Sequence, residues 1–242
     1  DPDDPFTLFA SDWGTVKATW RAALTRSIAG CRIGVLVDEL RDASPPIAKA
    51  CNEALELLER EGAVLVDVHL PLLEMANAVG PIVIAGESAA NASDDLARHR
   101  ADFSDEVRLV YGLMQCVTAQ EHLRALRTRT RLREALAETI AGVDVLALPT
   151  HARLAAPYPL AESRMQVSDT ASTASMAPFC FAANLTGVPA GSIPVGMHDG
   201  LPIGLQIVGD AFDEASVLAV SAALERCGVT NLPEPRSFAT IA

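Results

Sequence analysis

Nucleophilic and basic side chains are scattered along the 242 residues, and few of them stand at spacings that could do chemistry together. A thiol paired with an imidazole can cleave an acyl bond, and Cys180 could pair with His151 or His198 in this way. Cys180, however, lies between Phe179 and Phe181. A thiol in apolar surroundings keeps its proton, so we predict a buried and inert cysteine.

Serine chemistry needs a base beside the hydroxyl, and an unprotonated lysine can serve as that base. The lysines of the chain are Lys17 and Lys49, and we expect both on the surface, where most lysines lie. Ser192 stands in Ala-Gly-Ser-Ile-Pro, which is not the Gly-x-Ser-x-Gly elbow of a hydrolase. A further group of serines has no glycine around it: Ser163, Ser168, Ser172 and Ser175. These residues alone predict no complete serine site.

Metal and cofactor chemistry have little support. The histidines have no i,i+4 partner, and the cysteines are odd in number without a Cys-x-x-Cys pair, so neither a zinc site nor a disulfide framework is expected. No Walker loop or Gly-x-Gly-x-x-Gly run indicates a nucleotide cofactor. The residues concerned are His69, His99, His122, His151 and His198, with Cys31, Cys51, Cys116, Cys180 and Cys227. We therefore predict neither a metal nor a cofactor.

Composition narrows the class of partner. Half of the residues are hydrophobic, which is enough for a sizeable core, and the formal net charge is -12. That charge argues against a nucleic-acid backbone or an anionic membrane surface as a partner. No apolar run reaches the roughly 18 residues of a membrane span. Scattered cysteines suit a reducing compartment, so we predict a cytoplasmic protein.

The elements that must position any site begin with an α/β unit. Residues 31–37 form a short apolar run of buried-strand length, and residues 63–68 form another. Between them, Ser44 is a candidate N-cap before two prolines, and an apolar face at helical spacing continues to Gly62. Strand, helix and strand with such short joints predict a right-handed parallel βαβ unit, and hence the α/β class.

Three helices are predicted outside this unit in the first 140 residues. Residues 13–28 have a loose helical pattern, and residues 71–97 are small and weakly patterned around Gly80-Pro81, which favours a buried, kinked helix. Within it, Glu87 could be a catalytic carboxylate, although a surface carboxylate is the commoner outcome. Residues 119–140 form a long helix.

Arginines recur along that last helix. Arg124, Arg127 and Arg131 share one face, while Arg129 and Arg133 lie between them in the sequence. The shared face could clamp a substrate carboxylate, but arginines beside glutamates are usually a solvated face with weak i,i+4 pairs. We therefore expect this face in solvent.

The C-terminal half is rich in strand and turn signals. Residues 142–150 form an apolar strand that ends in Pro-Thr, which places Thr150 at the sheet edge where α/β proteins bind ligands. Residues 192–195 and 203–208 are apolar runs joined by a polar turn with an Asp-Gly signal, so a hairpin is expected. Asp213 opens a helix after it.

This C-terminal block resembles the amidase signature family. The residues that carry the resemblance are 184–189 (Asn-Leu-Thr-Gly-Val-Pro), 193–196 (Ile-Pro-Val-Gly) and 199–206 (Asp-Gly-Leu-Pro-Ile-Gly-Leu-Gln). It extends more weakly to residues 32–35, 62–68, 142–150 and the Asp-Pro-Asp-Asp-Pro opening, so it covers most of the chain. The resemblance implies a mixed sheet flanked by helices, and an enzyme that hydrolyses amides.

The catalytic groups of that family are missing from this sequence. The family uses a serine in a Gly-Ser-Ser-Gly-Gly-Ser loop, a second serine and a lysine, and no such run occurs here. The resemblance therefore implies the C-terminal part of a longer enzyme, with an α/β domain that is incomplete in this chain. Residues 1–30 would be a linker and entry helix, and residues 31–242 the C-terminal part of a single domain. We predict no catalytic residue here. A first residue that is not Met fits a fragment or a processed product as well as it fits an intact protein.

The resemblance also implies which side chains line the substrate pocket: Thr150, Cys180, Asn184 and Gln206. The expected partners are a small-molecule amide and the N-terminal part of the same enzyme or a companion chain, and a homo-oligomer is compatible with the sequence. An alternative stays open at this point. The chain could be a non-catalytic α/β partner or ligand-binding subunit that retains the amidase scaffold.

Overall fold

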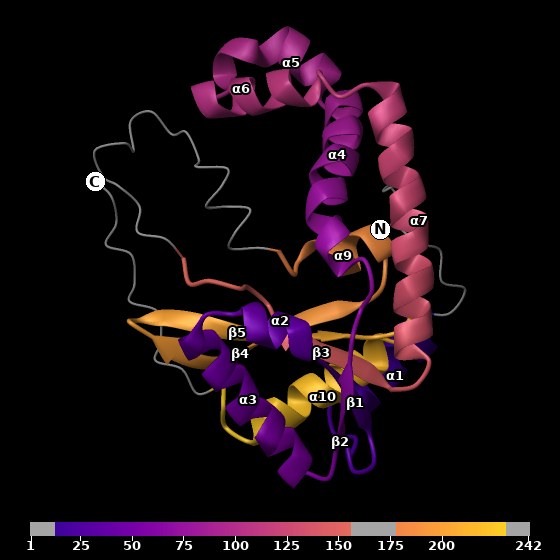
Figure 1. Cartoon of the computed structure of the whole chain (residues 1–242), viewed down its shortest axis with the longest axis vertical. Coiled ribbons are helices and arrows are strands. Elements are labelled where there is room, and N and C mark those ends of the chain that lie inside the picture. Colours follow the sequence, from indigo (N-terminus) through magenta and orange to yellow (C-terminus); the bar gives the residue numbers. More distant parts are fainter. Residues whose placement is uncertain (1–12, 156–177, 231–242) are drawn as a thin grey trace.

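A mixed sheet organises the parts of the chain that the computed structural model describes, residues 13–155 and 178–230. Its strand order is β2-β1-β3-β5-β4 (Figure 1). The strands are β1 (Arg32–Leu36), β2 (Val64–Val68), β3 (Val145–Pro149), β4 (Ala190–His198) and β5 (Leu201–Val208). β1 pairs in parallel with β2 and β3, whereas β5 is antiparallel to both β3 and β4. This confirms the predicted α/β class with a mixed sheet flanked by helices.

The predicted βαβ unit is present between β1 and β2. β1 leads into α2 (Val37–Asp42) and α3 (Pro45–Arg60) before β2. Ser44 is the N-cap residue, as predicted, but its hydroxyl accepts no capping hydrogen bond. The reason is local, because Pro45 and Pro46 have no N–H and the Ile47 N–H donates to the Ser44 carbonyl at 2.9 Å. The Ser44 N–H donates instead to the Ala152 carbonyl at 2.8 Å, which ties α3 to the segment after β3.

Helices cover both faces of the sheet and create two cores (Figure 1). On one face, α3 and α10 (Glu214–Arg226) bury side chains such as Ile33, Val145 and Leu205. On the other, α4 (Leu73–Asn91), α7 (Ala119–Ile140) and α9 (Phe181–Thr186) bury others such as Leu146 and Leu148. Neighbouring residues of β3 point to opposite faces, so this strand is buried along its whole length.

Helix boundaries differ from the predictions in two places. The first helix, α1 (Trp13–Ala23), ends before residue 28, and the helix expected over residues 71–97 ends at Asn91 with Pro81 inside it. A separate arm follows, made of α5 (Ser93–His99), the 3-10 turn η1 (Arg100–Asp102) and α6 (Asp105–Met114), which stands off the body (Figure 1). Weak apolar patterning gave no signal for this break.

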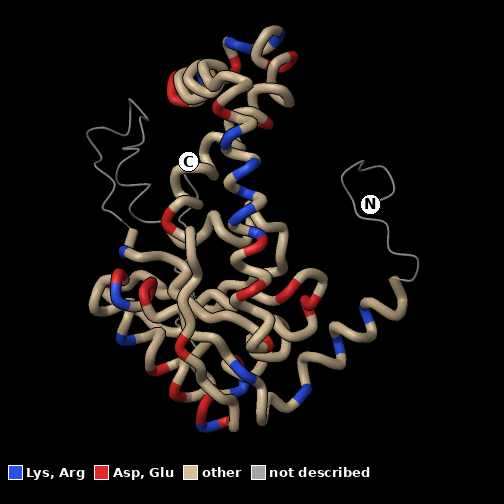
Figure 2. The backbone as a smooth tube through the Cα atoms, turned by 45° about the vertical axis from the view of Figure 1, so that its right-hand side comes forward, with Lys and Arg blue, Asp and Glu red and all other residues tan. Residues whose placement is uncertain are grey.

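The long helix α7 matches its predicted bounds. A capping box fixes its start, because the Thr118 hydroxyl accepts from the Glu121 N–H at 3.2 Å and the Glu121 carboxylate accepts from the Thr118 N–H at 2.8 Å. Arg124, Arg127 and Arg131 are exposed, as expected for a solvated face. Figure 2 shows blue basic residues recurring along the long vertical helix, which is α7 in Figure 1.

The predicted hairpin is also confirmed. Asp199 and Gly200 have φ values of 49° and 79°, the left-handed pair that a two-residue turn between twisted strands requires. The helix opened by Asp213 is α10, and its N-cap carboxylate accepts from the Ser216 N–H at 3.1 Å. The Asp-Pro opening and the serines of residues 163–175 lie outside the described residues. None of the described helices is long and apolar enough to cross a membrane.

Candidate functional site

A small polar cluster lies where β3 ends beside β5 and β4. Thr150 directly follows β3, and its N–H donates to the Gly204 carbonyl at 2.9 Å. The Thr150 hydroxyl oxygen lies 2.6 Å from that of Ser192 on β4, and either group can donate. The two side chains meet because Gly204 leaves the space between them empty. A Cβ on Gly204 would lie 2.7 Å from both hydroxyl oxygens.

The segment that leads into α9 packs onto this cluster. The Cys180 thiol donates to the Thr150 carbonyl at 3.2 Å, and the Gln206 amide nitrogen donates to the Phe179 carbonyl at 3.3 Å. Gln206 is buried, so this bond satisfies an amide that has lost water. Three predicted pocket residues, Thr150, Cys180 and Gln206, are thus brought together around residues 179–180.

The environment of Cys180 favours the inert thiol over a thiol–imidazole pair. Cys180 is half-buried, and burial raises the pKa of its thiol above the ordinary value. Its sulfur bonds to a backbone carbonyl, while His198 lies at the end of β4 with Nε2 3.7 Å from the Asp199 carboxylate. A protonated thiol is a poor nucleophile, so Cys180 fits a wall position.

Asn184, the fourth predicted residue, faces a different cavity. It is exposed on α9 and lines a hollow of about 260 Å³ between α4, α7 and α9. Glu87 and Arg129 supply its other polar groups. The remaining lining residues are Gly80, Val83, Ile84, Phe181 and Leu185. The predicted set is therefore divided between the two sides of α9.

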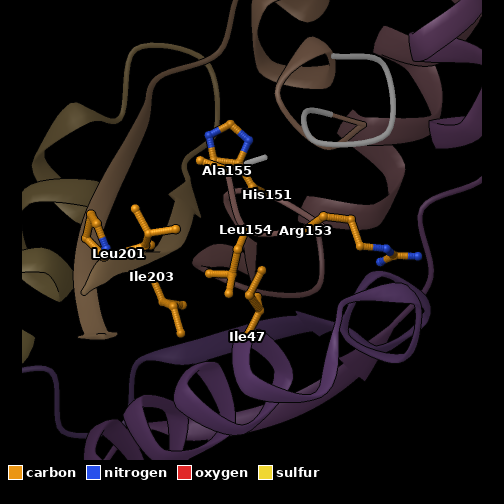
Figure 3. Close-up of a pocket in the computed structure, with 9 residues that line it drawn as sticks. Ile47, His151, Arg153, Leu154, Ala155, Leu201 and Ile203 are labelled. Carbon is orange, nitrogen blue, oxygen red and sulfur yellow. The ribbon is translucent and has the colours of Figure 1, made fainter. Parts of the chain in front are cut away.

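A second hollow, of about 150 Å³, lies between α3, β5 and the segment after β3 (Figure 3). Its walls are apolar and include Ile47, Leu154 and Ile203. His151 also lines it, whereas the Arg153 side chain extends away toward α2, where its guanidinium lies 3.6 Å from the Asp42 carboxylate. This hollow shares Gly204 with the polar cluster, so the two adjoin.

Two residues of these sites were not predicted as site residues. The sequence singles out Ser192 only as a possible nucleophile in an elbow motif. It meets Thr150 because β5 pairs with β3, and no local pattern gives that pairing of distant strands. Arg129 was grouped with the other arginines of α7. It is half-buried, and its Nε donates to the Leu185 carbonyl at 2.5 Å. The signal that could have separated it is its helical spacing from the buried residues of α7, which are Ala125, Leu132, Leu136 and Ile140.

The lysines lie as expected for surface residues. Lys17 is exposed on α1, and Lys49 is exposed on α3 with its Nζ 3.8 Å from the Glu53 carboxylate. Within residues 13–155 and 178–230, no three His, Cys, Asp or Glu side chains are grouped to hold a metal ion.

Comparisons with known proteins identify the family. A family model described as Amidase matches residues 5–218. A glutamyl-tRNA(Gln) amidotransferase subunit of Shouchella clausii (strain KSM-K16) is 31% identical over 232 residues, covering 86% of this chain and 47% of the relative. Fatty acid amide hydrolase of Medicago truncatula is 31% identical over 209 residues, covering 84% of this chain and 34% of the relative. The chain belongs to the amidase signature family.

Solved structures agree with this membership at the level of fold. The crystal structure of a bacterial aryl acylamidase of the amidase signature family aligns with a TM-score of 0.72 and 23% identity, covering 96% of this chain and 49% of the other. The chain therefore spans about a third to a half of the length of these amidase relatives. Its polar cluster and both hollows belong to this part of the amidase fold.

Proposed function

We propose that this chain is the substrate-facing, non-reactive part of an amide hydrolase. In this proposal, the catalytic groups lie on polypeptide outside the 242 residues, either the N-terminal part of the same enzyme or a companion chain. The observation that carries the proposal is the polar cluster at the end of β3. Thr150, Cys180 and Gln206 meet there beside the hydroxyl of Ser192, and the sequence lacks the family's Gly-Ser-Ser-Gly-Gly-Ser loop.

The arrangement of the sheet supports an approach of the catalytic groups along β4. Along β4 and β5, Ile193 and Ile203 are buried against α3, whereas Ser192 and Pro202 are exposed on the side of the polar cluster. β4 is also the last strand of the described sheet, so its outer edge is unpaired there. The β2 edge lies on the far side of β1 and β3 from the cluster. Catalytic groups that must reach Thr150 therefore approach at β4 and not at β2.

The chemistry assigned to the whole enzyme is acyl transfer. A serine oxygen attacks the amide carbonyl carbon as a base removes its proton, and backbone N–H groups stabilise the oxyanion. The C–N bond then breaks, and the leaving nitrogen takes the proton as ammonia or an amine. Water attacks the resulting ester, which releases the carboxylate and restores the serine hydroxyl. Within this scheme Thr150, Cys180 and Gln206 form one wall of the pocket, while Asn184 lines the neighbouring cavity between α4, α7 and α9. None of the four carries a step.

A companion chain is a further part of the proposal. One relative is named as a subunit of an amidotransferase, which indicates that members of this family work with other chains. We propose the cytoplasm as the compartment, because all five cysteines are free thiols, as a reducing environment maintains.

The second candidate is a non-catalytic partner or ligand-binding subunit. The absence of any Gly-Ser-Ser-Gly-Gly run in the sequence favours it, since the scaffold is present without the reactive loop. Intact-mass measurement of the natural gene product separates the two. A product about twice as heavy that contains a Gly/Ser-rich loop, or a co-purifying chain that contains one, supports the enzyme. A natural product of 242 residues without such a companion supports the partner.

A further inference from the structure

The short helix α9 is tied to the sheet at its N-terminal end. Cys180, its N-cap residue, bonds to the Thr150 carbonyl, and the Phe179 carbonyl accepts from the Gln206 amide. These two bonds are 3.2 and 3.3 Å long and are the links between α9 and the polar cluster. A six-residue helix has little stability of its own, so its place depends on such anchors.

The C-terminal end of α9 has a different anchor. A helix end leaves carbonyls without partners inside the helix. The Thr186 hydroxyl donates to the Ala182 carbonyl at 2.8 Å, and the Gly187 N–H, at a φ of 77°, donates to the Ala183 carbonyl at 2.8 Å. The Leu185 carbonyl accepts instead from Arg129 Nε of α7, at 2.5 Å. A guanidinium at a helix C-terminus also lies favourably with respect to the helix dipole.

Arg129 differs from the other arginines of its helix. Arg124, Arg127 and Arg131 are exposed, whereas Arg129 is half-buried and lines the cavity of about 260 Å³. A hydrogen bond from a charged donor is stronger when water is partly excluded from it. Its acceptor, Leu185, is a buried residue of the core formed by α4, α7 and α9. The contact therefore joins two residues that are 56 positions apart in the sequence, at a part-buried place.

We propose that Arg129 is a positioning residue that clamps α9 to α7 and so holds Cys180 against the polar cluster and Asn184 at the cavity between α4, α7 and α9. The clamp fixes the C-terminal end of α9, and the bonds to Thr150 and Gln206 fix its start. Loss of the clamp frees α9 to lift from α7 while the sheet stays intact. The clamp itself follows from the geometry, and only its meaning for catalysis rests on the proposed function.

Alkylation of Cys180 reports the position of α9 directly. The 242-residue chain is treated with iodoacetamide at alkaline pH, and the modification of each cysteine is followed by peptide mass spectrometry. In Arg129→Met, which keeps an unbranched side chain without N–H donors, Cys180 is expected to react about tenfold faster, the order expected for loss of one charge-assisted hydrogen bond. Arg129→Lys keeps the charge without the planar fork, so an intermediate rate is expected.

Two comparisons separate positioning from a general loss of stability. Cys51, which is fully buried in α3, must keep its wild-type rate in Arg129→Met, because it reports opening of the opposite core. Arg127→Met, at an exposed position of the same helix, must leave the alkylation rate of Cys180 unchanged. An unchanged Cys180 rate in Arg129→Met, or an equal rise at Cys51, overturns the proposal. If Arg129→Met does not fold, Arg129→Lys is judged by the same two criteria.

The test does not depend on amide hydrolysis, so its failure is distinct from failure of the proposed function. In a longer, active gene product, Arg129→Lys should lower kcat/KM for an amide substrate while Arg127→Lys leaves it unchanged. Cys180 could react faster in Arg129→Met while no natural gene product hydrolyses an amide. That result would support the clamp and contradict the proposed amide hydrolase.

Discussion

At the scale of single residues, the polar cluster depends on Gly204 having no side chain. Thr150 and Ser192 lie on strands separated by β5, and their hydroxyl oxygens come within 2.6 Å of each other because Gly204 between them has only hydrogen. Strand pairing brings the three positions together, since Pro194, two residues from Ser192, is the register partner of Gly204. A local pattern in the sequence cannot contain this contact.

Gly204→Ala should therefore destabilise the chain. Its Cβ would lie 2.7 Å from both hydroxyl oxygens and 3.1 Å from the Thr150 Cβ, so strands or side chains must shift. We expect a loss of about 1–3 kcal/mol in the free energy of unfolding, as for other overpacked positions, measured by urea denaturation. Gly142→Ala is the control, because nothing lies within 4 Å of its added Cβ. Equal stability of the two variants would show that the hydroxyl pair is loosely held.

The buried thiol of Cys51 makes the free energy of unfolding depend on pH in the alkaline range. Burial raises its pKa from 9.0 to about 12. The folded chain therefore holds a proton that the unfolded chain loses, so the stabilisation is complete below pH 9.0 and is lost as the pH rises toward about 12. One such proton gives a slope of about 1.4 kcal/mol per pH unit. Urea unfolding across this range should show a shallower loss in Cys51→Ala than in the wild type, and identical slopes would contradict the assignment.

At the scale of elements, α9 is seated by the fit of α4 against it. Gly80 lies opposite Phe181, and an added Cβ would come within 2.2 Å of the ring. Gly86, two turns along α4, faces His122 of α7 in the same way, at 2.4 Å. Small residues on α4 thus let it approach both α9 and α7. This explains why α4 carries so weak an apolar pattern and is still a packed helix.

Gly80→Ala should weaken this packing. We expect it to lower the free energy of unfolding by about 1–3 kcal/mol, because the Phe181 ring must leave its rotamer or α9 must move. Gly112→Ala in α6 is the matched control, since its Cβ meets nothing within 4 Å. That variant should gain about 0.5–1 kcal/mol from helix propensity alone. Urea denaturation followed by circular dichroism measures both, and a stabilised Gly80→Ala would refute the close fit.

Local signals explain which elements could be predicted. Features that depend on neighbouring residues were predicted. They are the strand-helix-strand unit, the bounds of α7 and the Asp199-Gly200 turn. The antiparallel pairing of β3 with β5 was not predicted, since those strands are far apart in the chain. The arm from α5 to α6 was also missed, because the weak apolar pattern of residues 71–97 does not mark where α4 ends at Asn91.

The site was predicted in part for the same reason. Thr150 follows from the end of an apolar strand, and Cys180 and Gln206 were chosen from the family resemblance. The same resemblance implied Asn184, but α9 turns it toward the cavity between α4, α7 and α9. Arg129 looked like one arginine among several, because its partner Leu185 lies 56 residues away.

At the scale of the whole molecule, the described sheet has a polar cluster near its edge strand β4. The cluster lies at β3, β5 and β4, and β4 ends the sheet order. The relatives that share this fold are about two to three times as long as the matched part of this chain. These observations support the proposal that the chain forms part of the substrate pocket and that the catalytic groups lie on other polypeptide.

Hydrolysis of 4-nitroacetanilide tests that proposal most directly. The 242-residue chain and the complete natural gene product, with any co-purifying chain, are assayed side by side for release of 4-nitroaniline. We predict no release above the buffer rate from the 242-residue chain and steady turnover from the complete product. Turnover by the 242-residue chain alone, abolished in Ser192→Ala, would contradict the proposal, because the reactive hydroxyl would then lie within these residues.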